Sequence, residues 1–560
     1  MSRAPSARWM YSPPVPPAAA HDLNVHPIIA TLLHRRGISS VEELSTFLAS
    51  DRSTLHDPFL VPNMRRAVDR LLRAQESRET VAVFGDFDVD GITATLILVK
   101  TLHALGIDTR PYIPHRVLEG HGLNTSAVRY LKEQGVSLIA TVDCGVSSPV
   151  EVDEANALGM DVLITDHHSL PSKLPNAYAI VSTALENGRY PFRHLTGAGI
   201  AFKLAHALCL ATNTPLEESV FELAALGTVG DVAPLTGENR ALVREGLKLL
   251  NCNPSPGVAE LCRAAGVQPS DVDSEAVSYI LAPRLNASGR LEDSLTSYNL
   301  LASASREEAA PLADRLEAMN QERKNLMDEA LAIARQEVLA QKALPHLLLV
   351  ASERFNPGVN GLVAGKLVEE FYRPAIVASL GEVAQASARS IPEFNIASAL
   401  DRCRDLLQRH GGHPRAAGFT AEPAVLPELH TRLLQIAKES LDGLKLERCI
   451  AIDAILPLSR LNGEVIQWLN KMQPFGEGNP APVFLSHNVQ VLRSAAIGGD
   501  GRHLRLTLRD GGVTWDAIAF DDNGIQPQSN RIDVVYSLSA GSRQDRRVLS
   551  LRILDMADAG

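Results

Sequence analysis

The sequence has few cysteines and no apolar run long enough to cross a membrane. Its 6 cysteines are scattered over 560 residues and never form a Cys-x-x-Cys pair. This pattern favours reduced, mostly buried thiols in a cytoplasmic protein over a disulfide framework. Without an apolar segment of spanning length, no transmembrane helix and no membrane partner are expected.

The N-terminus also lacks the apolar core of a secretory signal, and the chain lacks an excess of basic residues. Residues 1–22, rich in proline and alanine, predict an extended or disordered lead-in. The net charge is −11, from 54 basic and 65 acidic side chains. On its own this balance argues against nucleic-acid binding. However, a metal site concentrates acids, and a local basic path can coexist with an acidic surface, so total charge does not decide the matter.

The length predicts two to four domains, and the first half has the pattern of an α/β fold. Helices are expected over 24–37, 40–50 and 63–75, with Ser39 or Ser40 as an N-cap. From 81 to about 250, short apolar runs alternate with helical stretches, as in a parallel sheet covered by helices.

The second half predicts a long helix, another α/β unit and a small barrel. Apolar residues at three-to-four spacing predict one helix over 305–341. A helix simply packed on the surface is the alternative to a connector between two domains. Strands are then expected at 346–352, 374–379 and 446–456, and helices at 360–372 and 395–411.

Residues 483–556 form short strand-like runs separated by Gly, Asp and Asn turns, which is typical of an OB-like β-barrel. No lysine follows Lys471, and the cations of this segment are arginines, which can pair with phosphate and stack on bases. A solvated strand face is the alternative. The arginines considered are Arg493, Arg502, Arg505, Arg509, Arg543, Arg546 and Arg547.

Candidate metal ligands follow apolar runs in a fixed order. They occur in the segments VAVFGDFDVDGIT, LIATVDCGV, VLITDHHS and ALGTVGDVAPL. The candidates are Asp86, Asp88, Asp90, Asp143, His167 and Asp231. Ligands gather at the carboxyl ends of strands in open α/β sheets. Carboxylates favour hard divalent cations, and the histidine among them points toward manganese or a similar ion.

A single Asp after a strand is often only a helix N-cap or a turn residue. That interpretation weakens for Asp86, Asp88 and Asp90 together, closed by Gly91. It weakens further for the Asp-His-His run at 166–168, because two adjacent imidazoles at a strand end rarely serve packing.

The ordered motifs GDFDVDG, VDCG, DHH and GDVAPL resemble the DHH superfamily of metal-dependent phosphoesterases and, within it, the RecJ family of single-strand-specific exonucleases. Five further segments are similar to that family: APRLNASGR (282–290), NPGVNG (356–361), SARSIP (387–392), GGHPRAAGF (411–419) and PFGEGNPAPVF (474–484). The resemblance covers roughly residues 25 to 555.

The resemblance implies two α/β lobes, a DHH domain and a DHH-associated domain, joined by the long helix and followed by an OB-like barrel. The implied segments are 1–75 (lead-in and helices), 76–300 (DHH catalytic domain), 301–342 (connecting helix), 343–445 (DHH-associated domain) and 446–560 (OB-fold nucleic-acid-binding domain).

The resemblance also implies two divalent cations, Mn²⁺ or Mg²⁺, that promote in-line displacement at phosphorus. Asp88, Asp143 and His167 resemble direct ligands, with Asp143 the best candidate to bridge both cations. Asp90 and Asp231 complete the set, and Asp86 either joins it or orients a ligand. Asp166 would hold an imidazole in its tautomer, and His168 would contact the scissile phosphate or protonate the leaving oxygen. Cys144 is expected to be a small neighbour of the site rather than a thiolate ligand.

A pocket for the terminal 5′-phosphate is implied for Ser387, Arg389 and Arg290, since arginine forks and hydroxyls suit a terminal phosphate. An interdomain ion pair is the alternative for Arg284 and Arg290. The further candidates near the substrate are Arg116, Arg284, Gln321 and His413.

The implied function is a metal-dependent 5′→3′ exonuclease that degrades single-stranded DNA to 5′-mononucleotides in DNA repair and recombination. We expect a monomer, with a single-strand binding protein or a helicase as possible partners. One alternative is a phosphodiesterase for short oligonucleotides or cyclic dinucleotides, whose representatives are generally shorter and lack the barrel. Another is a non-catalytic DNA-binding scaffold, which would have eroded metal motifs.

Overall fold

The computed structural model describes residues 7–559 except for 14, 16–22, 117, 186–188, 499–500, 502, 521–525, 528 and 544–545, and it leaves out the side chains of 540–548. The predicted lead-in and Arg502 therefore lie largely or wholly outside the described residues, as do the side chains of Arg543, Arg546 and Arg547. The chain divides into two compact units. The smaller contains Met1–Met10 and Ala318–Ala451, and the larger contains Tyr11–Glu317 and Ile452–Gly560.

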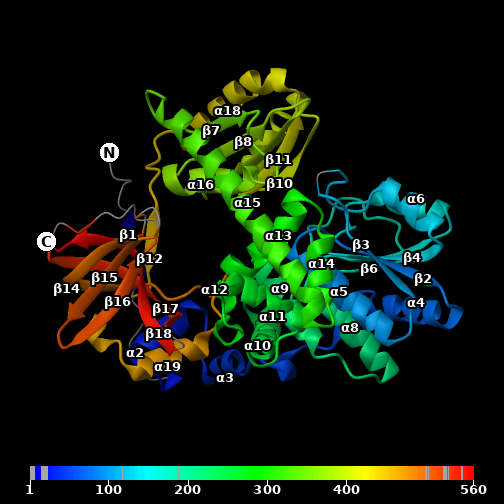
Figure 1. Ribbon diagram of the computed structural model, residues 1–560, viewed down its shortest axis with the longest axis horizontal. Coiled ribbons are helices and arrows are strands. Elements are labelled where there is room, and N and C mark those ends of the chain that lie inside the picture. Colours follow the sequence, from blue (N-terminus) through cyan, green and yellow to red (C-terminus); the bar gives the residue numbers. More distant parts are fainter. Residues whose placement is uncertain are drawn as a thin grey trace. The chain divides into compact units, whose positions relative to one another are not determined.

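The larger unit contains the predicted parallel sheet, with strand order β3-β2-β4-β5-β6 (Figure 1). Its strands are β2 (Thr80–Phe84), β3 (Thr109–Tyr112), β4 (Val136–Val142), β5 (Asp161–Thr165) and β6 (Ala179–Val181). The three central strands are apolar and almost wholly buried, because helices cover both faces of a parallel sheet.

Helices lie on both sides of this sheet, α4, α5 and α8 on one face and α6 and α7 on the other (Figure 1). Their bounds are α4 (Met64–Ser77), α5 (Val89–Ala104), α6 (Thr125–Glu133), α7 (Pro149–Ala157) and α8 (Gly197–Thr212). Further helices follow: α9 (Ser219–Gly230), α10 (Gly237–Cys252), α11 (Pro256–Ala265), α12 (Ser274–Ala276), α13 (Ala282–Leu291) and α14 (Leu295–Ala302). The alternation predicted from the sequence is confirmed.

The first two helices belong to the core of the barrel. Helix α2 (Pro27–Arg35) and helix α3 (Val41–Ala49) contribute Leu32, Leu33 and Leu44 to an apolar cluster that includes α19 (Gly463–Met472) and the barrel strands. Ser40 caps α3 in a capping box with Glu43, which confirms the predicted N-cap.

The C-terminal strands close into the predicted barrel. The strands are β14 (Phe484–Ile497), β15 (His503–Asp510), β16 (Val513–Ala519), β17 (Arg531–Arg543) and β18 (Arg546–Asp558). They pair in the order β14-β15-β16-β18-β17, and β14 also pairs with β17, so the sheet has no free edge along these strands. The short strand β13 (Ala454–Ile455) adds to β14.

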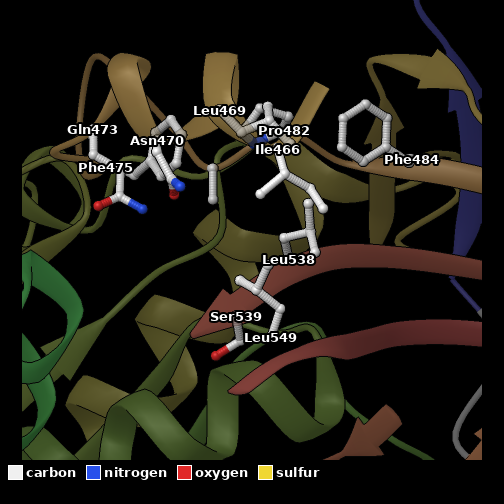
Figure 2. A pocket seen from close by; sticks show the side chains of 11 residues that line it. Ile466, Leu469, Asn470, Gln473, Phe475, Pro482, Phe484, Leu538, Ser539 and Leu549 are labelled. Carbon is white, nitrogen blue, oxygen red and sulfur yellow. The ribbon is translucent and has the colours of Figure 1, made fainter. Parts of the chain in front are cut away.

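A small pocket lies beside the barrel, where Ile466 and Leu469 of α19 face Leu538 of β17 and Leu549 of β18 (Figure 2). The described residues that line it include no charged side chain. It therefore has the composition of a packing defect in the core rather than of a reactive site.

The smaller unit contains a mixed sheet with strand order β10-β11-β9-β8-β7. Its strands are β7 (Leu348–Ser352), β8 (Ala375–Ser379), β9 (Ala384–Arg389), β10 (Arg409–His413) and β11 (Ala416–Ala421). Its helices are α16 (Asn360–Phe371), α17 (Ile396–Asp401) and α18 (Leu426–Leu441). Helix α15 (Arg306–Leu339) confirms the predicted long helix, and the boundary between the two units falls inside it. Strands β1 (Arg8–Tyr11) and β12 (Cys449–Ile452) form a separate pair.

The helix predicted over 395–411 is wrong in its second half. Helix α17 ends at Asp401, and Arg409–His413 is a strand paired with β11. The backbone groups of β11 need a partner on that side, and the glycines at 411 and 412 disfavour helix, so pairing across the tight turn wins over local periodicity.

Among the described residues, none of the helices combines the length and the apolar content that crossing a lipid bilayer requires.

Candidate metal centre and substrate-binding residues

The candidate ligands converge at one edge of the parallel sheet. Asp86, Asp143 and His167 follow β2, β4 and β5, which are neighbours in the sheet. Because parallel strands end at the same edge, loops distant in sequence meet there. Asp231 reaches the same place from the end of α9.

Two of the carboxylates are fixed by helix N-termini. Asp88 caps α5, and its Oδ1 accepts hydrogen bonds from the N–H groups of Asp90 at 3.0 Å and Gly91 at 3.1 Å. Asp90 is buried in the first turn of α5, and its two oxygens accept from Gly197 N at 2.7 Å and Ala198 N at 2.8 Å. The positive ends of α5 and α8 thus hold acids that are deprived of water.

Asp143 has a strained backbone and an unsatisfied oxygen. Its φ is +60°, which is unusual for a residue other than glycine and is typical of functional sites. Its Oδ1 is buried and has no hydrogen-bond partner, although His167 Nε2 lies 3.0 Å away. Asp143 Oδ1 and His167 Nε2 are thus close without a hydrogen bond between them. This is the arrangement expected of two atoms that bind the same cation. A Cβ on Gly197 would lie 2.4 Å from Asp143 Cβ, so the glycine makes this approach possible.

His167 connects the carboxylates from different loops. Its Nε2 also lies 3.8 Å from Asp90 Oδ2 and 3.9 Å from Asp231 Oδ2. Burial, with the neighbouring charge of His168, lowers the pKa of His167 to about 4. A neutral imidazole is the form that binds a metal. After Asp231, Val232 has a φ of +59°, which is a strained conformation for a β-branched residue.

The electrostatics of the cluster require a cation. Burial first, and then mutual repulsion, raise the pKa of Asp88 to about 6 and that of Asp231 to about 8, and burial raises the pKa of Asp143 far above its usual range. Several acids that cannot ionise together are stabilised when divalent cations neutralise them. Candidate ligand atoms gather in three groups. One contains Asp90, His167 and Asp231, and another contains Asp86, Asp88 and Asp143. The third, Asp143, His167 and His168, shares a residue with each of the other two. This oxygen-rich donor set with one imidazole fits Mn²⁺ or Mg²⁺.

His168 is held by Asp166 next to these groups. Its Nδ1 donates to Asp166 Oδ1 at 2.7 Å, and the second oxygen of Asp166 accepts from Val146 N at 3.0 Å. Burial opposes the charged form of both groups. The hydrogen bond between them nevertheless lowers the pKa of Asp166 and raises that of His168 to about 9. His168 is therefore oriented and able to carry a proton.

Cys144 is buried beside Asp143, and burial raises the pKa of its thiol well above the ordinary value. A neutral thiol is a poor metal ligand, which agrees with the expectation of a small neighbour of the site.

The sequence reasoning missed His121. Its Nδ1 lies 2.9 Å from Asp86 Oδ2, and its ring packs edge-on against His168 with 5.3 Å between centroids. Glycines at 120 and 122, both with positive φ, flank the histidine. A histidine between two glycines, five residues after Arg116, was the available signal.

The other predicted substrate residues of the larger unit have different surroundings. Arg116 Cζ lies 4.7 Å from the ring centroid of Phe87, and Asp86 and Asp88 act electrostatically on its guanidinium. Arg284 is buried and forms an ion pair with Glu317, which lies in the same compact unit. Arg290 is half-buried in the last turn of α13. The substrate roles of these three residues stay predictions.

Three predicted substrate residues share one face of the sheet in the smaller unit. Ala416 of β11 pairs with Arg389 of β9 on one side and with His413 of β10 on the other. Directly paired residues point to the same face, and so does Ser387, two positions before Arg389. Between these three residues the sheet carries only Ala416 and the glycines at 411 and 418, while Val377 of β8 pairs with Ser387 on the other side.

Two further features belong to the same unit. The Arg389 guanidinium lies over Gly361 of the NPGVNG segment, where a Cβ would come within 3.0 Å of Nη2. Gln321 is exposed on α15 and donates to Asn325 at 3.0 Å.

The described barrel arginines line one exposed surface. Arg505 and Arg509 alternate with buried leucines along β15, and Arg493 of β14 is also exposed. Arg509 donates to Gln490 of the adjacent strand at 2.7 Å.

Family models assign the parts of this fold to DHH-type hydrolases. The DHH family, N-terminal domain, matches residues 80–228, the DHHA1 domain matches 341–439, and the RecJ OB domain matches 452–555.

The chain belongs to the RecJ family. It is 38% identical over 546 residues to the single-stranded-DNA-specific exonuclease RecJ of Bacillus subtilis, covering 96% of this chain and 68% of that protein. A crystal structure of Thermus thermophilus RecJ in complex with Mn²⁺ superposes with a TM-score of 0.84 at 29% identity, over 99% of this chain and 80% of the other. The Mg²⁺ complex of RecJ from the same organism gives a TM-score of 0.78, also at 29% identity, over 99% of this chain and 79% of the other.

Proposed function

We infer that this chain is a metal-dependent exonuclease that degrades single-stranded DNA. The observation that carries this conclusion is the convergence of an intact set of metal-ligand candidates in a chain that matches RecJ proteins through the catalytic domain, the DHHA1 domain and the OB domain. A repair and recombination role is consistent with degradation of single strands.

We propose that Asp88, Asp143 and His167 are direct ligands, completed by the carboxylates of Asp90 and Asp231. Asp143 bridges two divalent cations, and Asp86 is a ligand or orients one. The unsatisfied Oδ1 of Asp143 and the neutral state of His167 support this assignment. Bound Mn²⁺ or Mg²⁺ would neutralise phosphate charge and ionise a water at neutral pH.

His168 is proposed to hold the proton that the leaving oxygen needs. Its Nδ1 is occupied by Asp166, so its Nε2 is the atom available to a phosphate or a leaving group. Asp166 fixes the tautomer and supports the protonated ring, as in other carboxylate–histidine pairs.

Recognition of the 5′ end is assigned to the sheet face that carries Ser387, Arg389 and His413. A terminal phosphate carries extra charge and suits a guanidinium, a hydroxyl and an imidazole displayed together. Further candidates for contacts to the strand are Arg116, Arg284, Arg290 and Gln321. The proposed products are 5′-mononucleotides released in the 5′→3′ direction.

We propose that each segment has one role. Residues 76–300 catalyse cleavage, residues 301–342 connect the domains, residues 343–445 bind the 5′ end and residues 446–560 bind the strand. Residues 1–75 precede them. The matches to DHH, DHHA1 and RecJ OB models support this division. We further propose a cytoplasmic monomer that works with a single-strand binding protein or a helicase.

A cleavage assay with Mn²⁺ tests the function. A 3′-labelled, 5′-phosphorylated oligodeoxynucleotide is compared as a single strand and as a duplex, alongside a dinucleotide. The expected result is a ladder that shortens from the 5′ end of the single strand only.

Rapid dinucleotide cleavage with an inert long strand would favour the phosphodiesterase alternative. No cleavage of any substrate, together with no Mn²⁺ binding, would favour the scaffold. The barrel and the intact ligand set argue against both alternatives.

A further inference from the structure

One carboxylate organises the loop that borders the metal centre. Residues 113–124, of which 117 lies outside the described residues, join β3 to α6 and carry Arg116 and His121. Within this loop, Glu119 Oε1 accepts a hydrogen bond from His115 N at 2.7 Å. Its Oε2 accepts from Tyr112 Oη at 2.8 Å and from Asn124 Nδ2 at 3.0 Å. Glu119 therefore ties the end of a strand, the loop and the start of a helix to one point.

Both anchors of Glu119 belong to the rigid part of the unit. The Tyr112 ring stacks on Phe84 of β2 with 5.1 Å between centroids and 13° between planes. Asn124 also caps α6, where its Oδ1 accepts from Ala127 N at 2.8 Å. The hydrogen bonds of Glu119 thus hold the loop in a fixed position relative to the sheet and α6.

Among the described residues at the tip of the loop, apolar packing contributes little. Leu118, next to Glu119, is 81% exposed, and the glycines at 120 and 122 have no side chains to bury. Positive φ values of 82° and 87° at these two glycines allow the chain to turn and to present His121. The described residues of the tip are accordingly held by polar contacts. The Glu119 side chain makes three of them, and the N–H groups of Glu119 and Gly120 donate to His115 O at 2.8 and 3.3 Å.

Two side chains of the loop face the proposed reaction site. His121 makes a hydrogen bond of 2.9 Å with Asp86 and packs against His168. The Arg116 guanidinium lies over Phe87, the residue between Asp86 and Asp88.

We propose that Glu119 is a positioning residue, which acts through His121 on Asp86 and through Arg116 on the substrate. This inference rests on the proposed roles of Asp86 at the metal centre and of Arg116 in substrate binding. Partners that orient a metal ligand typically contribute a factor of about 10–100 to metal affinity or activity. We expect the effect of Glu119 to be near the lower limit, because it acts through His121.

The test is a measurement of Mn²⁺ affinity by titration calorimetry on the whole protein. We expect Glu119→Ala and His121→Ala each to weaken Mn²⁺ binding roughly 10-fold. The double variant is expected to be no worse than His121→Ala, because both changes remove the same contact to Asp86. Glu119→Gln keeps an amide oxygen for His115 N and should recover part of the affinity.

Unchanged affinity in Glu119→Ala, or losses that multiply in the double variant, would overturn the proposal. Glu222→Ala is the matched control, since Glu222 is a buried carboxylate that accepts hydrogen bonds from Ser255. It should lower the thermal midpoint without weakening Mn²⁺ binding. An equal loss of affinity in this control would mean general destabilisation and would also overturn the proposal.

Asp86→Ala separates this inference from the ligand assignment beneath it. If Mn²⁺ affinity is insensitive to Asp86→Ala, the proposed role of Asp86 fails and the inference fails with it. If affinity depends on Asp86 but not on Glu119, only the positioning role fails.

For the substrate contact, Glu119→Ala should raise the KM for single-stranded DNA several-fold when Arg116 is present and leave it unchanged in Arg116→Ala. An equal rise in both backgrounds would reject action through Arg116.

Discussion

The two α/β sheets of this protein present functional side chains in different ways. In the parallel sheet of the larger unit, Asp86, Asp143 and His167 lie beyond the strand ends, in loops with strained or capped backbone. In the mixed sheet of the smaller unit, Arg389 and His413 stand on the sheet face and are separated by one alanine in register.

The difference fits the ligands proposed for the two sites. A cation needs ligands that approach it from several directions, and loops at the ends of adjacent strands provide this. A terminal phosphate suits donors displayed side by side, and a sheet face with small residues between its polar side chains can provide them. The first arrangement brings several carboxylates together, whereas the second separates Arg389 and His413 by an alanine. The two sites should therefore respond differently to substitution.

The largest effect is expected for Asp143→Ala. Loss of a bridging ligand removes several kcal/mol of transition-state stabilisation, which corresponds to a loss of roughly 10³-fold or more in cleavage rate. Quantitative gel assays of single-strand cleavage with Mn²⁺ measure it. Asp153→Ala, an exposed acid of α7, is the control and should retain full activity. Substantial activity in Asp143→Ala would remove this residue from the ligand set.

A smaller and substrate-dependent effect is expected for Arg389→Ala. A hydrogen bond to a charged group contributes about 1.5–3 kcal/mol, so cleavage of a 5′-phosphorylated strand should slow by roughly 10–100-fold. A 5′-hydroxyl strand should be nearly unaffected, since it lacks the terminal phosphate. The control is Arg402→Ala, which removes an exposed ion pair with Glu439. Equal losses on both strands would show that Arg389 does not read the 5′ end.

Added methyl groups should distinguish the two sites by their packing. In Gly197→Ala the new Cβ would lie 2.4 Å from Asp143 Cβ, and such overpacking costs about 1–3 kcal/mol. We expect a lower thermal midpoint and weaker Mn²⁺ binding. In Gly411→Ala the new Cβ would have no neighbour within 4 Å, so both quantities should change little. Similar results for the two variants would contradict the contrast drawn between the sites.

The smallest effect concerns the metal-free protein between pH 6.5 and 8. Without a cation, the pKa is about 8 for Asp231 and about 9 for His168, both above their unfolded values of about 3.9 and 6.5. The folded state therefore binds more protons than the unfolded state, and the free energy of unfolding contributed by these groups falls as pH rises through this window. His167, with a pKa of about 4, acts in the opposite sense only below pH 6.5.

Thermal melts of chelator-treated protein at pH 6.5 and 8 measure this effect. Mn²⁺ should reduce the decline, because it binds the ionised carboxylates. The slope should be smaller in Asp231→Asn. A midpoint that rises with pH in the chelated protein, but not in this variant, would contradict the assignment.

Much of the fold and of the metal centre was predictable from the sequence. Acids at or shortly after the end of an apolar run are a local signal, and they identify Asp88, Asp143 and Asp231 as candidate ligands. The helix over 305–341 and the barrel strands were equally visible, because their periodicity depends only on nearby residues.

Other features depended on pairing between distant segments. Strand β10 replaced a predicted helix because β11 required a partner. The placement of Arg389 and His413 on one face depends on the register of three strands, which no local pattern specifies.

The sequence by itself determined the order of the candidate ligands and the type of most elements, β10 excepted, since apolar periodicity and strand-end acids are encoded within a few residues. Only the tertiary structure decided that Asp143 adopts a left-handed conformation against Gly197, and that the loop held by Glu119 brings His121 to Asp86. These features depend on close approach and hydrogen bonding between segments far apart in the chain, which are fixed only when the whole unit packs.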